Sequence, residues 1–99
     1  MNLNIKNKTE ITCPIKKTAE LLSDIWTILI IKELINSKKR FSELEKILIG
    51  ISTRTLTLKL KRLVLEGLVI KKDGLYSLTK NGQKLQVVFD AMAMCGKNI

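Results

Sequence analysis

The stretch from Ser42 to Leu68 constrains the fold of this chain more than any other part of the sequence. It contains an amphipathic segment, a turn at Ile49-Gly50-Ile51, and a second amphipathic segment that is basic and rich in threonine. A β-hairpin is expected directly after it. The order helix, tight turn, helix and hairpin is that of a winged helix-turn-helix, whose second helix is the candidate reader of DNA.

Hydroxyl side chains mark the expected start of both helices. Ser42, followed three residues later by Glu45, predicts a capping box, with Phe41 packing back on the first turn. Ser52 is the expected N-cap of the second helix. Between the two helices, Gly50 is the residue best able to take the positive φ that ends a helix.

The second helix divides into two faces. Leucines at helical spacing predict one buried stripe, formed by Leu56, Leu60 and Leu63. The residues expected roughly opposite that stripe, or flanking the opposite face, are Arg54, Thr57, Leu58, Lys61 and Arg62. A basic, exposed face of this kind is what a helix in the major groove needs.

Residues 68–78 form the expected hairpin. Asp73-Gly74 predicts a two-residue type I′ turn. That turn places Lys71 opposite Tyr76, with Val69 on the same face of the hairpin. We therefore expect Val69 to meet the core, while Lys71 lies across the Tyr76 ring.

The N-terminal half supplies an arm and two helices. Met1 to Thr12 show no clear period and are expected to be a flexible arm, leaving residues 13–99 as the domain. Cys13-Pro14 opens a helix that ends near Ser23-Asp24, a pair that can cap the next helix. That next helix, Ile25 to about Asn36, is apolar on most faces and is expected at the centre of the domain.

The C-terminal helix is expected from Lys80 to Cys95, capped by Thr79. It is more apolar than a terminal helix of one small domain requires. Packing against the chain's own core is the simplest explanation, and a dimer interface shared with the first helix is the one we favour. The candidate interface residues are Ile15, Ala19, Leu22, Leu85, Val88, Phe89, Met92 and Cys95.

Composition points to a polyanionic partner and away from catalysis. The net charge is +9, from 18 basic and 9 acidic residues, which favours nucleic acid over membrane but does not by itself choose DNA over RNA. The chain has no histidine, the commonest general base and zinc ligand. Two cysteines cannot make a four-thiolate site, and no Gly-rich phosphate loop is present. We expect no enzymatic activity, no metal and no cofactor.

The same sequence predicts a cytoplasmic protein. Its two cysteines lie far apart and do not suggest a disulfide framework. The first ten residues contain lysine but lack the apolar region of a signal peptide. The most apolar run, Ile25 to Ile31, is far shorter than the roughly 20 residues of a membrane span.

Candidate DNA contacts lie on the helix after Ser52, on the loop before the helix that starts at Ser42, and on the hairpin. Arg54 is the best candidate for a bidentate base contact, and Thr57 or Leu58 could meet thymine methyls. Lys71 and Lys72 would touch the flanking backbone or the minor groove. The alternative for all of these residues is a solvated basic surface. The full set is Lys39, Arg40, Ser42, Ser52, Thr53, Arg54, Thr55, Thr57, Leu58, Lys61, Arg62, Lys71 and Lys72.

Motifs spread from Cys13 to Gly96 carry a family resemblance. They are Cys13-Pro14, Ile25-Trp26-Thr27-Ile28-Leu29-Ile30, Glu33-Leu34, Arg40-Phe41-Ser42-Glu43-Leu44, Ile49-Gly50-Ile51-Ser52, Leu56-Thr57, Leu60, Leu63, Glu66-Gly67-Leu68-Val69, and Tyr76-Ser77-Leu78-Thr79 with Gly82. In this combination the chain resembles the HxlR-type transcriptional regulators, which are dimeric winged-helix proteins related to the MarR group. The resemblance implies a homodimer through the first and last helices, with the helix after Ser52 in the major groove.

The chain departs from the family pattern in two places. Family wings are usually longer, with a basic stretch and prolines, whereas this hairpin is cut to an Asp73-Gly74 turn. The expected recognition helix has Thr53 where the family often has proline, and Leu58 where a polar residue is common. The target sequence is therefore expected to differ.

The resemblance also makes Cys13 a candidate redox sensor, because several family members sense electrophiles or oxidants through the matching cysteine. Its place at a helix N-terminus, with Lys16 and Lys17 one turn on, favours the thiolate. The alternative is an inert cysteine that simply precedes the helix. Cys95 lies at the other end of a helix and is expected to pack in the interface.

The predicted fold is mainly α with a small β-hairpin: a winged helix-turn-helix of about five helices plus a short wing. The predicted function is that of a homodimeric repressor bound to a palindromic operator in double-stranded DNA. A second hypothesis is a winged helix used for protein–protein assembly, without specific DNA reading. The sequence names no small-molecule effector.

Overall fold

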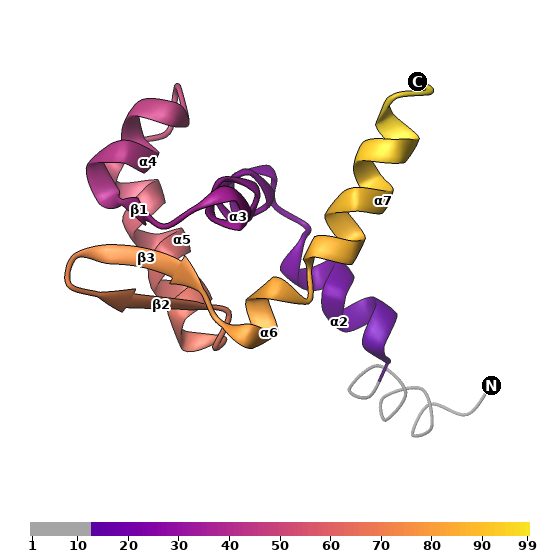
Figure 1. Cartoon of the computed structure of the whole chain (residues 1–99), viewed down its shortest axis with the longest axis horizontal. Coiled ribbons are helices and arrows are strands. Elements are labelled where there is room, and N and C mark those ends of the chain that lie inside the picture. Colours follow the sequence, from indigo (N-terminus) through magenta and orange to yellow (C-terminus); the bar gives the residue numbers. More distant parts are fainter. Residues whose placement is uncertain (1–12) are drawn as a thin grey trace.

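The computed structural model describes residues 13–99, and the expected flexible arm, residues 1–12, lies outside them. The element order of the described part is α2 (Pro14–Leu21), α3 (Ile25–Asn36), β1 (Lys39–Arg40), α4 (Phe41–Ile47), α5 (Thr53–Leu65), β2 (Val69–Lys72), β3 (Leu75–Leu78), α6 (Lys80–Gln83) and α7 (Gln86–Gly96). The predicted winged helix-turn-helix is confirmed, with α4 and α5 as the helix pair and β2 and β3 as the wing (Figure 1).

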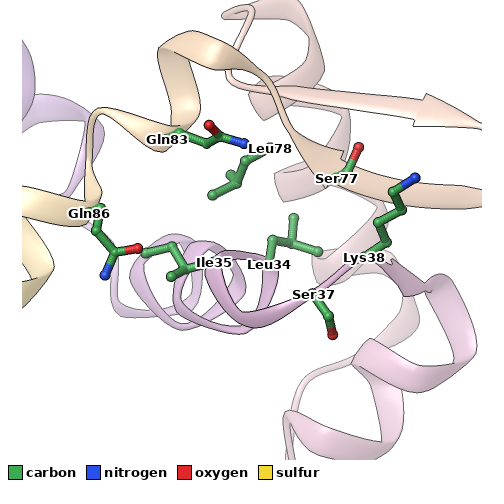
Figure 2. Close-up of a pocket in the computed structure, with 8 residues that line it drawn as sticks. All are labelled: Leu34, Ile35, Ser37, Lys38, Ser77, Leu78, Gln83 and Gln86. Carbon is green, nitrogen blue, oxygen red and sulfur yellow. The ribbon is translucent and has the colours of Figure 1, made fainter.

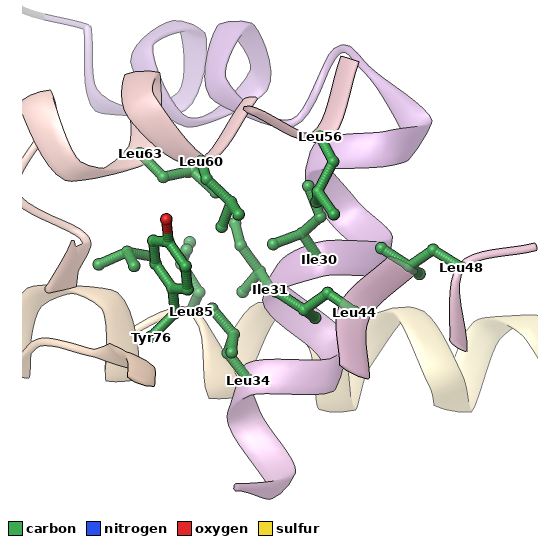
Figure 3. Packing of buried hydrophobic residues seen from close by; sticks show 11 residues of the cluster. Ile30, Ile31, Leu34, Leu44, Leu48, Leu56, Leu60, Leu63, Tyr76 and Leu85 are labelled. Atoms are coloured by element: carbon green, nitrogen blue, oxygen red, sulfur yellow. The ribbon is translucent and has the colours of Figure 1, made fainter. Parts of the chain in front are cut away.

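Helix α3 lies at the centre of the fold, as predicted. Ile30 and Ile31 are fully buried. Figure 3 shows them within one apolar cluster, to which α4, α5, the sheet and the segment before α7 also contribute side chains. The burial is one-sided rather than complete, because Ile25 at the start of the helix is 66% exposed. The apolar sequence of α3 is therefore wider than the face that the described chain covers.

Helix α4 begins two residues earlier than predicted, because its N-cap is Arg40 and not Ser42. The backbone N–H of Arg40 donates to the Glu43 carboxylate at 2.7 Å, so Arg40, not Ser42, is the N-cap residue. Ser42 lies inside the first turn and Phe41 is the first helical residue. The reason is strand β1, whose extended backbone runs to Arg40 and sets the boundary there. Glu45 is thereby released from its expected capping role.

The turn and the start of α5 agree with the prediction. Gly50 has a φ of +94°, the left-handed conformation that favours glycine. Ser52 caps α5 by accepting the backbone N–H of Thr55 at 3.0 Å. The leucine stripe is at most 1% exposed, and consists of Leu56, Leu60 and Leu63.

The hairpin has the predicted turn and register. Asp73 and Gly74 both have positive φ, 55° and 78°, as a type I′ turn requires. Lys71 pairs with Tyr76 across the strands, and its ammonium lies 5.4 Å from the centre of the Tyr76 ring. Val69 is buried in the core, again as predicted.

A third strand, β1, was not predicted. Lys39 pairs with Tyr76 and Arg40 with Leu75, so the order of the antiparallel sheet is β1-β3-β2. The sequence-based expectation of a loop at this position was wrong. Two charged residues carry no hydrophobic period, and only the unpaired edge of β3 makes them a strand.

The last helix of the prediction is broken in two. Thr79 caps the single-turn helix α6 by accepting the backbone N–H of Gly82 at 3.1 Å, and α7 begins only at Gln86. Between the two helices Leu85 turns inward and is 7% exposed, within the chain's own core. Leu85 therefore cannot face a second copy, and its assignment to a dimer interface was wrong.

Gly82 is required by a close backbone contact. A Cβ at this position would lie 2.2 Å from the carbonyl oxygen of Leu68, which itself accepts the Thr79 N–H at 3.0 Å. Helix α6 can thus press against the start of the hairpin only without a side chain at this point.

We predict that Gly82→Ala lowers the free energy of unfolding by about 1–3 kcal/mol, because backbone must move to admit the methyl group. Chemical denaturation measures this change. Gly96→Ala is the matched control, since a Cβ at Gly96 meets no atom within 4 Å. Equal effects of the two substitutions would contradict the close-contact explanation.

Candidate nucleic-acid interface

The side of α5 that faces solvent, opposite the leucine stripe, is basic; we call it the outward face of α5. Arg54, Leu58 and Lys61 are exposed opposite the leucine stripe, and the exposed Thr57 and Arg62 flank them. Leu58 is 53% exposed, so the predicted rotation of the helix is confirmed. Its apolar side chain belongs to the outward face and is not a misplaced core residue.

Leu65 extends this face and was missed by the sequence-based prediction. It is 79% exposed and follows Leu58 by seven residues, two helical turns. Its neighbours Leu63 and Val64 made it resemble core in the sequence. The seven-residue spacing from Leu58 was the available signal.

The hydroxyl groups at the start of α5 already donate hydrogen bonds to other groups of the chain. The Ser52 hydroxyl donates to Thr55 at 2.9 Å, that of Thr53 to the Glu45 carboxylate at 2.6 Å, and that of Thr57 to the Thr53 carbonyl at 2.8 Å. Phosphate oxygens only accept hydrogen bonds. In this arrangement these three hydroxyls have no proton to offer a phosphate, and their oxygens can act only as acceptors.

The Thr53–Glu45 bond also links the two helices of the pair. It joins the first turn of α5 to α4 across the turn that contains Gly50. The sequence had suggested a different partner for Glu45, a cap within its own helix. The bond that forms instead holds the start of α5, including Arg54, against the helix before it.

An ion pair between α3 and α5 was likewise missed. The Lys59 ammonium lies 2.7 Å from the Asp24 carboxylate, and both side chains are 31% exposed. Asp24 also caps α3, accepting the backbone N–H of Trp26 at 3.3 Å and the Thr27 hydroxyl at 2.9 Å. Lys59 precedes Leu63 by four residues, which places it beside the buried stripe and was the signal for this contact.

This network changes the acidity of Asp24. The hydrogen bond from Lys59 is the largest cause that holds the pKa of the Asp24 carboxyl below its ordinary value of 3.8. Burial opposes this shift, while the bonds from Thr27 and Trp26 reinforce it. Lys59 is thus a structural cation and does not count toward the outward charge of α5.

Lys39 is held by the end of α3. Its ammonium donates to the Ser37 hydroxyl at 2.7 Å and to the carbonyl of Glu33 at 3.3 Å. A cation in this position satisfies carbonyl groups that a helix C-terminus leaves without partners. The geometry therefore weakens the expectation that Lys39 contacts a phosphate.

Arg40 lies at the tip of the wing. A Cβ placed on Gly74 would be 3.0 Å from the Arg40 guanidinium, so this side chain reaches the hairpin turn. Arg40 and Lys72 are both cross-strand partners of Leu75, which puts them on the same face of the sheet. The short wing therefore gains a cation from β1 that the hairpin sequence alone did not show.

The remaining predicted contacts lie apart from Arg40 and Lys72. Ser42 is exposed in the first turn of α4. Lys71 is exposed but points to the Tyr76 side of the sheet, the face opposite Arg40. Arg62 forms a weak pair with Glu66 at 3.7 Å, one turn along α5.

Helices α2 and α7 lie on the side of α3 away from the wing (Figure 1). They line a common groove through Pro14, Ile15, Thr18, Ala19, Leu22 and Val88. Ile15 is 79% exposed, and Met92 and Cys95 are also exposed on α7, whereas Leu22, Val88 and Phe89 are half-buried. Of the predicted interface residues, Ile15, Ala19, Leu22 and Val88 therefore share one groove, while Met92 and Cys95 line a neighbouring hollow on α7 and Phe89 packs against the core.

Cys13 caps α2. Its Sγ accepts the backbone N–H of Lys16 at 3.5 Å, and the residue is half-buried.

Along the described residues 13–99, no helix is long and apolar enough to span a bilayer. Nor does this part of the chain gather three His, Cys, Asp or Glu side chains that could hold a metal ion.

The family described as HxlR-like helix-turn-helix matches residues 21–99. The chain belongs to this family. Among related sequences, the HTH-type transcriptional regulator sll1512 of Synechocystis sp. is 37% identical over 94 residues, which cover 87% of this chain and 69% of that protein. The resemblance inferred from the motifs is thereby confirmed.

Solved structures give the same result. Quinone-bound YodB from Bacillus subtilis matches with a TM-score of 0.81 at 32% identity, covering 86% of this chain and 97% of that one. The redox regulator HypR in its oxidised form matches with a TM-score of 0.79 at 30% identity, covering 88% and 97%. This HxlR-family chain is a DNA-binding transcriptional regulator of the helix-turn-helix type.

We predict that Asp24→Asn lowers the free energy of unfolding at pH 7 by roughly 1 kcal/mol, a value reduced for partial exposure of the pair. The substitution keeps a capping oxygen but removes the charge. Because the folded-state pKa of Asp24 lies below its ordinary value of 3.8, its stabilisation is complete above that pH and lost as pH falls through the lowered pKa.

Denaturation of both proteins between pH 7 and pH 2 tests this expectation. The stability difference should close at the acidic end of the series. Lys59→Met supplies the control, since in that background the Asp24→Asn difference should be smaller throughout. A difference that is independent of pH would exclude the ion pair as its cause.

Proposed function

We propose that the chain acts as a homodimeric repressor that occupies a palindromic operator. The observation that carries this proposal is the outward face of α5, where exposed cations surround an exposed leucine. A helix of this kind suits the major groove, because the cations suit phosphates and guanine edges while apolar groups suit thymine methyls. Repression follows if the operator overlaps a site that polymerase needs.

Contacts of different kinds are expected along this surface. Arg54, in the first turn of α5, is the candidate for the bidentate base contact. Lys61 and Arg62, further along, are candidates for phosphates, as are Arg40 and Lys72 at the wing tip. Lys39 drops from this set, because its ammonium already serves the end of α3.

The exposed apolar residues of α2 and α7 support the proposed homodimer. Exposed apolar residues gather there, including Ile15 at 79% and Val87 at 73% exposure. A small monomer rarely leaves so much contiguous apolar surface in water. A two-fold axis through this side would present two α5 helices to half-sites about one or two turns apart, near 34 Å per turn.

Selection of bound DNA from a random pool tests the proposal directly. We expect an enriched palindrome whose half-site spacing reports the dimer, and an affinity that falls steeply with salt. If no sequence is enriched and binding is absent even at low salt, the alternative of a protein–protein assembly module is favoured instead.

Arg54→Ala and Lys61→Ala should fail in different ways. For Arg54→Ala we predict a loss of about 1–3 kcal/mol of discrimination between the operator and a version mutated at the contacted base. For Lys61→Ala, affinity for both sequences should fall together and the salt dependence should become less steep. Fluorescence anisotropy with both duplexes measures the difference. Unchanged discrimination in Arg54→Ala would remove this residue from base reading.

Cys13 is the proposed site of regulation by thiol-reactive compounds. Its sulfur lies at the N-terminus of α2, where it accepts the backbone N–H of Lys16. The similar proteins are named as quinone-bound YodB and the redox regulator HypR, which supports a response of this type. With a quinone, the thiolate sulfur adds to a ring carbon and the ring takes up a proton, giving a hydroquinone thioether without another oxidant.

We predict that treatment with benzoquinone changes the operator affinity of the wild-type protein but not that of Cys13→Ser. Cys95→Ser is the control, since it retains Cys13 and should respond like the wild type. Operator affinity and the intact mass of each protein, before and after treatment, report function and adduct separately. A full response in Cys13→Ser would disprove the assignment.

A further inference from the structure

Leu58 is an apolar side chain at the centre of the outward face of α5. It is 53% exposed and lies between two exposed cations, Arg54 one turn before it and Lys61 one turn after it. Residues spaced by three or four positions share one side of a helix, so the three side chains lie in one row. A partner that covers this row must present an apolar group between negatively charged or hydrogen-bond-accepting groups.

Other surfaces of the described chain that could hold a small molecule or a second copy do not include Leu58. A pocket of about 500 Å³ is lined by α3, β3, α6, α7 and the residues just after α3, without any residue of α5 (Figure 2). The groove between α2 and α7 lies on the side of α3 away from the wing, whereas α5 packs against β2 of the wing (Figure 1). Leu58 therefore belongs to the surface that the proposed function assigns to DNA.

Duplex DNA offers an apolar group of this kind in its major groove. Among the four bases only thymine carries a methyl group there, at C5, while every base also presents hydrogen-bonding atoms. The leucine side chain can neither donate nor accept a hydrogen bond, so a G·C pair beneath it loses water from polar groups without gaining a partner. Leu58 thus favours thymine by contact with the methyl group and disfavours the pair that lacks it.

Thr57, which flanks Leu58, adds a second preference. Its hydroxyl donates to the Thr53 carbonyl at 2.8 Å, so its oxygen is left to accept. The donors that bases present in the major groove are the amino groups of adenine and cytosine. An A·T pair offers an amino group and a methyl group together, whereas a G·C pair offers the amino group alone.

We propose that Leu58 determines specificity by selecting an A·T pair in each operator half-site through the C5-methyl group of thymine, while Thr57 accepts a hydrogen bond from the adenine amino group. The step from Arg54 to Leu58 spans about 6 Å of helix axis, or about two base-pair steps. The selected pair therefore lies within about two steps of the base that Arg54 contacts. This inference rests on the proposed function, because it requires α5 to lie in the major groove.

Exchange of thymine for deoxyuridine, one position at a time in the operator selected from the random pool, tests the methyl contact. The exchange removes the methyl group and leaves base pairing unchanged. We expect one position per half-site at which the exchange, made in both half-sites, weakens binding by about tenfold or more, since one buried methyl group contributes a factor of about four. If no thymine near the Arg54 contact responds, the proposal is overturned.

Leu58→Ala and Leu65→Ala are the matched variants for this experiment. Both replace an exposed leucine on the same side of α5 by a strong helix former, and Leu65 lies about 10 Å further along the axis. At low salt, where binding is tighter, Leu58→Ala should bind the thymine and deoxyuridine operators equally. Leu65→Ala should keep the wild-type difference. A full methyl effect in Leu58→Ala would overturn the role of Leu58.

Cytosine with and without a 5-methyl group separates methyl contact from DNA shape, which can also favour A·T pairs. A C·G pair in place of the selected T·A pair should weaken wild-type binding. The 5-methyl group on that cytosine should restore about fourfold per half-site in the wild type and nothing in Leu58→Ala. An A·T preference that ignores both methyl exchanges would indicate shape readout and contradict the proposal.

Thr57→Val tests the hydrogen bond, because valine keeps the shape of threonine and removes the accepting oxygen. The probe is an operator in which the selected adenine is replaced by purine, which lacks the amino group. This replacement should cost the wild type about fivefold more affinity than it costs Thr57→Val. Equal losses would remove Thr57 from base contact.

The same experiments distinguish this inference from the proposed function. If the random pool yields no enriched operator, both are refuted. If an operator is enriched and Arg54→Ala loses discrimination, but the methyl exchanges change nothing, the proposed function stands and the selection of thymine by Leu58 is refuted.

Discussion

The burial of one leucine stripe of α5 against α3 is the contact on which the rest of the structure depends. Leu56 and Leu60 pack against Ile30 and Ile31 in a cluster that water does not reach. Because a helix has two sides, fixing this stripe inward fixes Arg54 and its neighbours outward. The Asp24–Lys59 pair adds a directional bond at the same junction, so the orientation of the outward face of α5 is set by packing and by charge together.

The basic character of the chain is therefore divided between two tasks. Lys59 and Lys39 complete the fold, the first by holding α5 to the cap of α3 and the second by satisfying the end of α3. Arg54 and Lys61 remain directed toward solvent. The net charge of +9 overstates what is available to a phosphate backbone, and individual partners decide which cations count.

Local rules in the sequence were enough for much of this fold. Asp73-Gly74 dictates its own turn and hence the hairpin register, and the leucine spacing in α5 dictates the buried side. Features created by distant partners were not predictable. Strand β1 exists only because β3 offers an edge, the break before Leu85 follows from a core position, and the Asp24–Lys59 pair joins segments 35 residues apart. The candidate contacts along α5 are exposed except for Thr55, but the hydrogen bonds of their hydroxyl groups could not be predicted from residue spacing.

Because the chain is broken between α6 and α7, the last helix can change its angle as a rigid rod. Its 11 residues extend about 17 Å from the pivot at Leu85. A tilt of about 10° at that pivot moves the far end by about 3 Å, close to the rise of one base pair. A continuous helix would have to bend to achieve the same displacement. The inward turn of Leu85 thus determines where the chain can change the angle of α7 relative to the body.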